Sequence, residues 1–288
     1  MLIADVLAPS LESNPNHQRT DMTKQSNRGT ALITGASGGI GAVYADRLAQ
    51  RGYDLILVAR DRVRLAGLAT QLSADTGRKA EVLTADLTRK ADLLRVEERL
   101  RSDAGVTLLV NNAGFGATAA LMDSDPDTLE SMIQLNVVAL TRLARAVVPG
   151  FVARGNGTII NIASSVALTP ELLNGTYSGT KAYVVNFTQA LHHELGAKHV
   201  RVQAVLPGAT RTEFWEAAGL PLKHLPEEIV MSAEEMVDAA LSGLDQGELI
   251  TIPSLPDARE WDAFNSARVA LGRNLSRNHA ADRYKVEA

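Results

Sequence analysis

The sequence predicts a single α/β domain built on a doubly wound, mostly parallel sheet of seven strands. From residue 30 onward, short apolar runs alternate with longer segments in which apolar residues recur about every 3.6 positions. The short runs are continuously apolar, which is typical of parallel strands that helices cover on both faces. This alternation predicts βαβ units, whose ligands bind beyond the carboxyl ends of the strands.

Seven runs are expected to form the strands. They are ALIT (31–34), DLILVA (54–59), AEVLTA (80–85), TLLVNN (107–112), TIINIA (158–163), VRVQAVL (200–206) and ELITI (248–252). Glycine stands near the end of several intervening segments, where it favours the left-handed backbone that ends a helix. The 288 residues, of which 45% are hydrophobic, are enough to bury a sizeable core.

Composition excludes several classes of function. The net charge of −4 provides no basic field for nucleic acid. The chain has no cysteine, which excludes disulfides, thiolate metal sites and a cysteine nucleophile, and fits the cytoplasm, where we expect the protein. No uninterrupted apolar run has the length of a membrane helix, and the histidines form no metal-binding pattern. We therefore expect neither a membrane, a metal nor a nucleic acid as partner.

The chain divides into three predicted segments: a mobile leader at 1–28, a dinucleotide-binding and catalytic domain at 29–252, and a helical extension at 253–288. The leader lacks the basic region and the long apolar region of a secretory signal. The extension has helical character from about 257 to 271, and it can pack on the core, on a partner subunit or over the active site. Its large apolar residues are Trp261, Phe264, Val269 and Leu271.

A glycine-rich loop, TGASGGIG at 34–41, follows the first predicted strand. Gly35, Gly39 and Gly41 permit a tight turn and close approach of the backbone to a phosphate. The next helix then presents free N–H groups to a pyrophosphate. Three glycines could also serve an ordinary β–α turn, but the strand–turn–helix context favours a dinucleotide. The expected contacts in this loop include Ser37 and Ile40.

The spacing Thr-Gly-x-x-x-Gly-x-Gly resembles the phosphate loop of the short-chain dehydrogenase/reductase family. The similarity extends over roughly residues 29–252, which is most of the chain. The resemblance implies a Rossmann-like fold and a nicotinamide-dependent oxidoreductase.

Residues at the end of the second strand bear on the choice of cofactor. An acidic residue there would hold the ribose 2′-hydroxyl of NAD, but this chain has Ala59 followed by Arg60. A guanidinium suits a 2′-phosphate, so NADP(H) is favoured. Asp61 keeps NAD open as a second interpretation, although it can also cap the next helix. Arg62 and Arg64 are expected on the surface.

The resemblance implies further cofactor contacts after the third and fourth strands. Asp86 would accept a hydrogen bond from the adenine amino group, with help from the Leu87 backbone. The segment NNAGFG at 111–116 would line the adenosine ribose, while Asn111 can be structural. The expected contacts in that segment are Asn112, Ala113 and Gly114.

Tyr177 and Lys181 are candidates for an acid/base pair. Residues four apart lie on one face of a helix, so both side chains can reach the same volume. A free phenol has a pKa near 10, and a neighbouring ammonium would lower it. This spacing alone is common on helix surfaces. The surrounding sequence favours the acid/base interpretation, because Ser164 follows the fifth strand and lies thirteen residues before Tyr177.

The resemblance implies a role for each polar residue of this group. Ser164 would bind the substrate carbonyl, and Tyr177 would exchange the proton. Lys181 would hold the nicotinamide ribose. Asn136 would bend its helix and connect a proton relay to solvent. Asn136 can also be a core amide with satisfied hydrogen bonds, and Ser165 can be a simple turn residue.

The segment PGATRTEF at 207–214 resembles the family's Pro-Gly segment beside the nicotinamide. The expected cofactor contacts here are Pro207, Gly208, Thr210 and Thr212. The substrate loop is expected at 213–232, and residues 172–174 border the same region. Its possible apolar wall consists of Phe214, Trp215, Leu220 and Leu222.

The predicted function is NADP(H)-dependent interconversion of a carbonyl compound and an alcohol. The alternatives are an NAD-dependent alcohol dehydrogenase of the same family and a non-enzymatic NADP(H)-binding sensor. Related epimerases need a longer substrate domain than 213–247 allows, and enoyl reductases space the Tyr and Lys more widely. Helices near 126–153 and 176–197 resemble those that pair subunits in the family, so a homodimer or homotetramer is expected.

Overall fold

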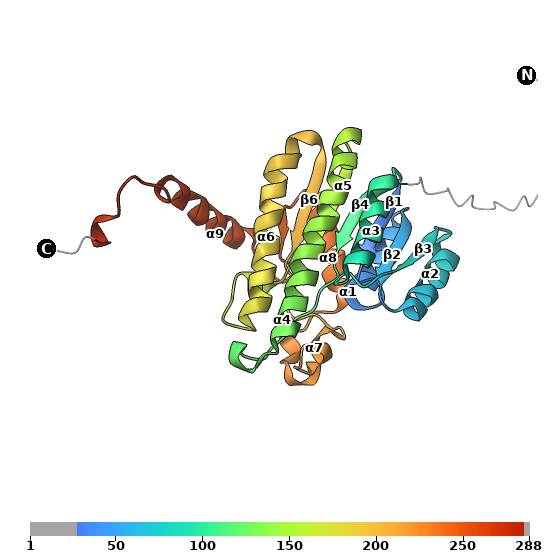
Figure 1. Cartoon of the computed structure of the whole chain (residues 1–288), viewed down its shortest axis with the longest axis horizontal. Helices are drawn as coiled ribbons and strands as arrows, with labels where there is room; N and C mark the ends of the chain where they lie inside the picture. Colours follow the sequence, from blue (N-terminus) through green and yellow to red (C-terminus); the bar gives the residue numbers. More distant parts are fainter. Residues whose placement is uncertain (1–27, 285–288) are drawn as a thin grey trace, which may run out of the picture.

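The computed structural model describes residues 28–284, in which one seven-stranded sheet has the order β3-β2-β1-β4-β5-β6-β7 (Figure 1). All neighbouring strands within this part of the chain are parallel, which confirms the predicted fold class. The strands are β1 (Thr30–Thr34), β2 (Asp54–Ala59), β3 (Ala80–Thr84), β4 (Val106–Asn111), β5 (Gly157–Ile162), β6 (Val200–Val205) and β7 (Ile250–Thr251). The predicted leader lies outside the described residues except for Arg28.

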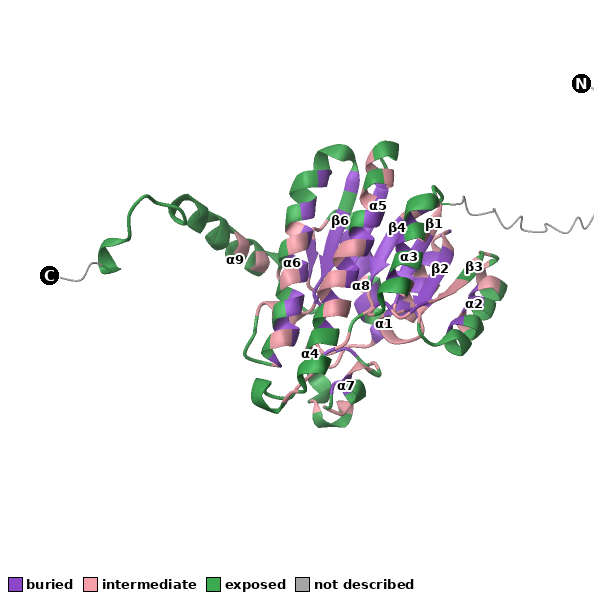
Figure 2. Cartoon of the chain, viewed as in Figure 1, coloured by how far each residue is buried: buried purple, intermediate pink, exposed green. Residues whose placement is uncertain are grey.

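Helices cover both faces of the sheet, and Figure 2 shows the buried strands between them. One face carries α1 (Gly39–Gln50), α2 (Arg62–Thr76) and α8 (Ala233–Gln246). The other carries α3 (Lys90–Ser102), α5 (Leu140–Arg154) and α6 (Gly175–Leu195). Three further helices lie outside these layers: α4 (Pro126–Ile133), α7 (Phe214–Ala217) and α9 (Ala258–Leu271).

The continuously apolar strands follow from this two-sided burial. In β1, Ile33 packs with the cluster around α1 and α8, whereas Leu32 packs with the cluster around α3 and α5. Successive side chains of a strand point to opposite faces, so both faces need apolar residues. In β5 all six residues are buried. The strand that differs most from its prediction is β7, which is confined to Ile250–Thr251 because it pairs only with the last two residues of β6.

Residues Pro126–Arg154 form one long helical stretch of α4, a π-helical segment (Gln134–Ala139) and α5. This stretch has the length and apolar composition of a membrane span. In the fold, however, Leu143, Val147 and Phe151 pack against the sheet and α3. The apolar composition is therefore explained by a helix that covers a buried sheet.

The C-terminal extension contains α9, close to the predicted helix, and Figure 1 shows α9 leading away from the body of the domain. Trp261 is partly buried against the cluster that contains Val184 and Ile250. Phe264, Val269 and Leu271 are each at least half exposed. Packing on the domain's own core is thus limited to the start of this helix.

Two glycines test how tightly the layers are packed. A Cβ at Gly157 would overlap the ring of Phe151, whereas a Cβ at Gly67 in α2 would meet nothing within 4 Å. We expect Gly157→Ala to lower the free energy of unfolding by about 2 kcal/mol, through overpacking. Gly67→Ala should raise it by about 0.5–1 kcal/mol, because alanine favours an exposed helix interior. Urea unfolding measures both, and an equal effect of the two substitutions would contradict this packing.

Candidate functional site

The carboxyl ends of β1 and β4 meet where the strand order reverses, and Thr34 ties them together. Its hydroxyl donates to the Val110 carbonyl oxygen at 3.2 Å and accepts from the backbone N–H groups of Asn112 and Ala113 at 3.0 Å each. Asn112 Nδ2 in turn donates to the carbonyl oxygens of Thr34 and Gly35 at 2.9 and 3.2 Å. The side chain of Asn112, a residue predicted to contact the cofactor, thus holds the glycine loop in shape.

The glycine loop has a backbone that a phosphate can approach. Gly35 and Gly39 have φ angles of 67° and 52°, a region that favours glycine. A Cβ at Gly41 would overlap the Gly35 carbonyl oxygen, so the third glycine lets α1 pack against the loop. Helix α1 has no side-chain cap and no acidic residue in its first turn. Its first N–H groups fit an anionic pyrophosphate.

The other two predicted residues of this loop, Ser37 and Ile40, are both half-buried. Ser37 is half-buried in the turn before α1. Ile40 is partly buried and packs against the hydrophobic cluster beneath the loop. The backbone of Ile40 is therefore the part that can face a ligand, while its side chain anchors the helix.

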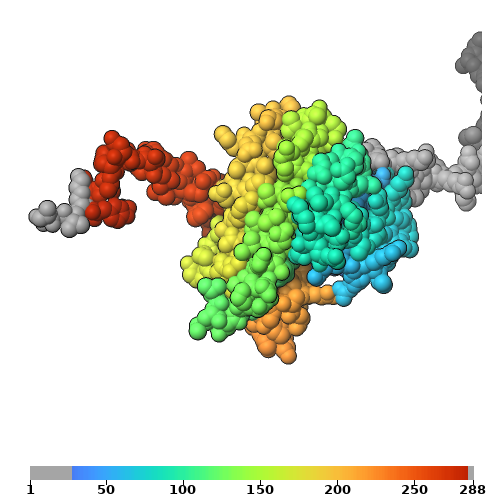
Figure 3. All heavy atoms as spheres, viewed as in Figure 1, coloured from blue at the N-terminus to red at the C-terminus, as the bar shows by residue number. Residues whose placement is uncertain are grey.

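At the end of β2, Arg60 is exposed and forms no ion pair with any residue of 28–284. Asp61 caps α2 by accepting from Val63 and Arg64 N–H groups at 3.0 Å each. Arg64, predicted to be a surface residue, contacts the substrate loop through Glu213 at 2.7 Å. Figure 3 shows this contact region, where the orange segment reaches the blue one.

The sequence did not indicate that Arg64 lies close to the glycine loop and to the substrate loop. Its Nη1 lies 3.8 Å from the position of a Cβ at Gly38, beside the glycine loop. Its side chain is 53% exposed, so it is free to exchange partners. Arg64 therefore brings a guanidinium beside the glycine loop, on the same strand–helix connection as Arg60.

After β3, the Asp86 carboxylate accepts from the N–H and the hydroxyl of Thr88 at 3.0 and 2.7 Å. Its second carboxylate oxygen is left to accept a hydrogen bond from an adenine amino group, and the residue is only half-buried. The side chain of Leu87 is buried in the core, so only its backbone faces the site. Asn111 donates to Asn161 Oδ1 at 3.0 Å inside the core, which agrees with a structural role.

Ser164, Tyr177 and Lys181 lie together beyond the end of β5. The Lys181 ammonium is 5.8 Å from the centre of the Tyr177 ring and donates to the Ile162 carbonyl oxygen at 2.9 Å. The Ser164 hydroxyl is near enough to Tyr177 to lower the pKa of the phenol, and it also donates to the Pro207 carbonyl oxygen at 3.4 Å. Ser165 donates its backbone N–H to the same carbonyl oxygen at 2.9 Å. Ser164 is therefore the serine that faces the phenol, as predicted.

Burial dominates the electrostatics of this group. It raises the pKa of Tyr177 to about 12, against the smaller lowering effect of the Ser164 hydrogen bond. It also lowers the pKa of Lys181 to about 8. The net shift of the Tyr177 pKa is therefore upward, opposite to the lowering expected from the sequence, because desolvation of the phenol is the largest effect.

Asn136 lies in the π-helical turn and all its polar atoms are engaged. Its Nδ2 donates to the Phe115 carbonyl oxygen at 2.9 Å and to Thr180 Oγ1 at 3.1 Å, and its Oδ1 accepts from Phe115 N–H at 3.1 Å. Gly114 lies between Asn136 and Lys181, where a Cβ would be 2.9 Å from Asn136 Oδ1 and 3.4 Å from Lys181 Nζ. Asn136 therefore positions the β4 loop around the ammonium.

The segment after β6 turns around the rim of the site. Pro207 is buried and accepts from the Ser165 N–H, and the Gly208 carbonyl oxygen accepts from Thr210 Oγ1 at 3.2 Å. Thr210 is buried, so its hydroxyl serves this turn. Thr212 is half-buried and its methyl group would be 3.0 Å from a Cβ at Gly39. Thr212 thus brings the β6 loop against the glycine loop.

The apolar wall surrounds Tyr177. The Phe214 ring centre lies 5.6 Å from that of Tyr177. A Cβ at Gly116 would be 2.6 Å from the Phe214 ring and 3.2 Å from Tyr177, so this small residue makes room for both rings. Trp215 is buried and donates to the Thr210 carbonyl oxygen at 2.9 Å, which makes it structural. Leu220 and Leu222 are half-buried at the outer side of the loop.

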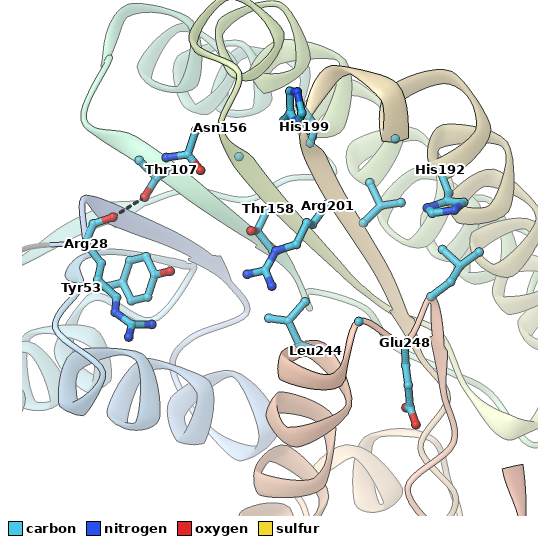
Figure 4. Close-up of a pocket in the computed structure, with 16 residues that line it drawn as sticks. Arg28, Tyr53, Thr107, Asn156, Thr158, His192, His199, Arg201, Leu244 and Glu248 are labelled. Carbon is cyan, nitrogen blue, oxygen red and sulfur yellow. Dashed lines mark hydrogen bonds between the residues drawn. The ribbon is translucent and has the colours of Figure 1, made fainter.

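A separate cavity of about 670 Å³ lies at the opposite, amino end of the strands (Figure 4). Arg28, Thr107, Thr158 and Arg201 line it, and the Thr107 hydroxyl donates to the Arg28 carbonyl oxygen at 2.9 Å. It contains none of the predicted site residues. Within residues 28–284, no group of three or more His, Asp or Glu side chains could hold a metal.

Comparison with known proteins agrees with this geometry. Residues 29–221 match the family model described as short chain dehydrogenase. A short-chain dehydrogenase from Sphingobium yanoikuyae in complex with NADPH is 51% identical, with a TM-score of 0.86 over 89% of this chain and 100% of that one. A bulky-bulky ketone specific alcohol dehydrogenase from Comamonas testosteroni is 46% identical, with a TM-score of 0.83 over 90% and 99%. Human 17-beta-hydroxysteroid dehydrogenase type 3 is 32% identical over 74% of this chain and 67% of its own length.

The buried Lys181 ammonium should cost stability. Its pKa falls from 10.5 to about 8 on folding, which corresponds to a penalty of about 3 kcal/mol at neutral pH. We expect Lys181→Met to raise the free energy of unfolding of the cofactor-free protein by about 1–3 kcal/mol, because it removes the buried charge. The Ile162 carbonyl oxygen loses its donor, which offsets part of the gain. The exposed Lys198→Met is the matched control and should change nothing.

The stability difference between Lys181→Met and the wild type should depend on pH, because folding lowers the pKa of Lys181. Between about pH 8 and 10.5 the unfolded chain binds more protons at this lysine than the folded protein does, so rising pH favours the folded state. The advantage of Lys181→Met should therefore be greatest below pH 8 and shrink above it. Denaturant titrations at several pH values measure it, and a constant difference across that range would contradict the prediction.

Proposed function

Because the chain belongs to the short-chain dehydrogenase/reductase family and is an oxidoreductase, we propose that it reduces ketones to secondary alcohols with NADPH, and runs the reverse oxidation. One observation carries this proposal. Ser164, Tyr177 and Lys181 form a desolvated cluster beyond β5, at the same sheet edge as a glycine loop that fits a pyrophosphate.

The residues of the carboxyl edge fit a nicotinamide dinucleotide. The glycine loop and the start of α1 would hold the pyrophosphate, and Asp86 would hold the adenine. Lys181 donates to one carbonyl oxygen in residues 28–284, so two N–H bonds remain for the nicotinamide ribose. Arg60 supports NADP(H), as does the NADPH complex of the Sphingobium relative.

The chemistry divides between cofactor and protein. When bound, NADPH supplies the hydride that turns the carbonyl carbon into a carbinol carbon. Ser164 donates a hydrogen bond that holds the carbonyl oxygen, and Tyr177 gives that oxygen its proton. Lys181 favours the phenolate that Tyr177 leaves behind, because an ammonium stabilises a nearby anion. Tyr177 regains its proton from solvent, which closes the cycle.

We propose a ketone with bulky groups on both sides of the carbonyl as the substrate class. The apolar surroundings of Tyr177 support it, and they are formed by Phe115, Ala117, Leu173 and Phe214. Leu121, Met122 and Leu172 are exposed apolar residues on the loops that follow β4 and precede α6. The specificity of the Comamonas relative points the same way.

A cytoplasmic homodimer or homotetramer is also proposed. The absence of cysteine supports the compartment, and α5 and α6, which lie side by side in Figure 1, supply the expected contact surface. Sedimentation of the purified protein tests the assembly.

We expect Tyr177→Phe to lower kcat by about a hundredfold to ten-thousandfold, because the proton donor is lost. The dissociation constant for NADPH should stay within about twofold. Tyr183→Phe is the matched control on the same helix, since the Tyr183 hydroxyl contacts Thr141 at 2.8 Å outside the site. Steady-state rates with a bulky ketone measure both, and full activity of Tyr177→Phe would rule out the proton transfer.

Arg60→Ala should weaken NADPH binding by about tenfold or more while leaving NADH binding unchanged. The reason is the loss of a charge-assisted hydrogen bond to the 2′-phosphate, worth about 1.5–3 kcal/mol. Arg62→Ala, two positions along the exposed start of α2, serves as the control. Fluorescence titration with each cofactor measures the effect. Equal losses for NADPH and NADH would show that Arg60 does not read the 2′-phosphate.

A further inference from the structure

Asn174, at the start of α6, forms four hydrogen bonds although its side chain is buried. Its Oδ1 caps the helix by accepting from the N–H groups of Thr176 and Tyr177 at 2.9 and 3.3 Å. Its Nδ2 donates to the Ala119 carbonyl oxygen at 2.6 Å and to Ser124 Oγ at 3.2 Å. Both halves of the amide are therefore used, one on the catalytic helix and one on the loop after β4.

The chemistry of the partners requires an amide at this position. The two backbone N–H groups need an acceptor, and the Ala119 carbonyl oxygen needs a donor. A carboxylate would cap the helix equally well but would face a carbonyl oxygen. A helix cap alone is satisfied by serine, threonine or aspartate. The donor half of Asn174 thus points to a function beyond capping.

The loop that Asn174 holds forms part of the apolar wall around Tyr177. Phe115 and Ala117 pack against the cluster that contains Tyr177. Thr118 donates its hydroxyl to the Ala218 carbonyl oxygen at 2.9 Å, which ties the loop to the end of α7. Beyond Ala119, the chain continues into a short 3₁₀ turn whose Leu121 and Met122 are 72% and 90% exposed. Asn136 holds the start of this loop at Phe115, and beyond it Thr118 and Asn174 anchor the loop from two different sides.

We propose that Asn174 is a positioning residue that sets the distance between the substrate-facing loop 115–124 and the Tyr177 hydroxyl. Its cap fixes the first turn of α6, which carries Tyr177, and its amide nitrogen fixes the loop to that same turn. The two parts of the site that must close on a carbonyl compound are thereby locked to one side chain. The inference rests on the proposed function, because it concerns the same carbonyl site.

The expected consequence is geometric. Without the tether, residues 119–124 lose both hydrogen bonds from the Asn174 amide nitrogen, at Ala119 and Ser124. The loop can then move relative to the Tyr177 hydroxyl. A displacement of about 1 Å at a reacting centre can cost about a hundredfold in rate. Groups at the opposite side of the site, such as the glycine loop and Arg60, make no contact with Asn174 and should bind NADPH as before.

Asn174→Asp separates the two roles. Aspartate retains the cap on Thr176 and Tyr177, but its second oxygen opposes the Ala119 carbonyl oxygen. With the new carboxyl ionised, we expect kcat/KM for a bulky ketone to fall by about tenfold or more, while the dissociation constant for NADPH stays unchanged. Asn174→Ala should show the same kinetic loss together with a lower Tm, because it removes the cap as well.

Hydrogen–deuterium exchange of the cofactor-free protein gives a readout that needs no substrate. Asn174→Asp should speed amide exchange in residues 116–124 and leave the first turn of α6 protected. If the wild type reduces no ketone, the proposed function fails, yet the exchange comparison still tests the tether.

One pattern would overturn the inference. It is an Asn174→Asp protein that has wild-type exchange in 116–124 and wild-type kcat/KM, alongside an Asn174→Ala protein with lowered Tm. Asn174 would then be a helix cap and nothing more.

Discussion

The rest of the site depends on the burial of the Lys181 ammonium against the Ile162 carbonyl oxygen. The ammonium lies at the carboxyl end of β5, where the Ile162 carbonyl oxygen holds it in a nearly dry environment. Burial of a cation is unfavourable, and the lowered pKa of this lysine is the measure of that cost. The surrounding backbone is shaped to accept it, since Gly114 leaves room beside it and Asn136 holds the β4 loop in place.

The remainder of the molecule brings loops from distant parts of the chain to this ammonium. Parallel strands end at one edge, so the loops after β1, β4, β5 and β6 converge there. Short polar side chains then fix the loops to one another, as Thr34 does between β1 and β4, and as Asn174 does between the β4 loop and α6. The precision of the site thus rests on side-chain to backbone hydrogen bonds that link loops far apart in sequence.

Much of this could be predicted from the sequence, because strands and helices have local signatures. The continuous apolar runs predicted the parallel sheet, and the resemblance of the motifs to those of the short-chain family predicted that Ser164, Tyr177 and Lys181 meet. Two features could not be predicted because they depend on contacts between distant residues. Arg64 meets Glu213 across 149 positions, and the phenol pKa depends on a burial that no local pattern encodes.

The central claim is that hydride reaches a ketone carbon at the Ser164–Tyr177–Lys181 cluster. Its most direct test is isotope transfer from NADPH that carries two deuterium atoms at C4 of the nicotinamide ring to a ketone with two bulky substituents, with the product examined by mass spectrometry and NMR. We expect one deuterium on the carbinol carbon, in a single configuration, with the wild type and almost none with Tyr177→Phe. An alcohol product without deuterium at that carbon, or equal labelling by both proteins, would contradict the account.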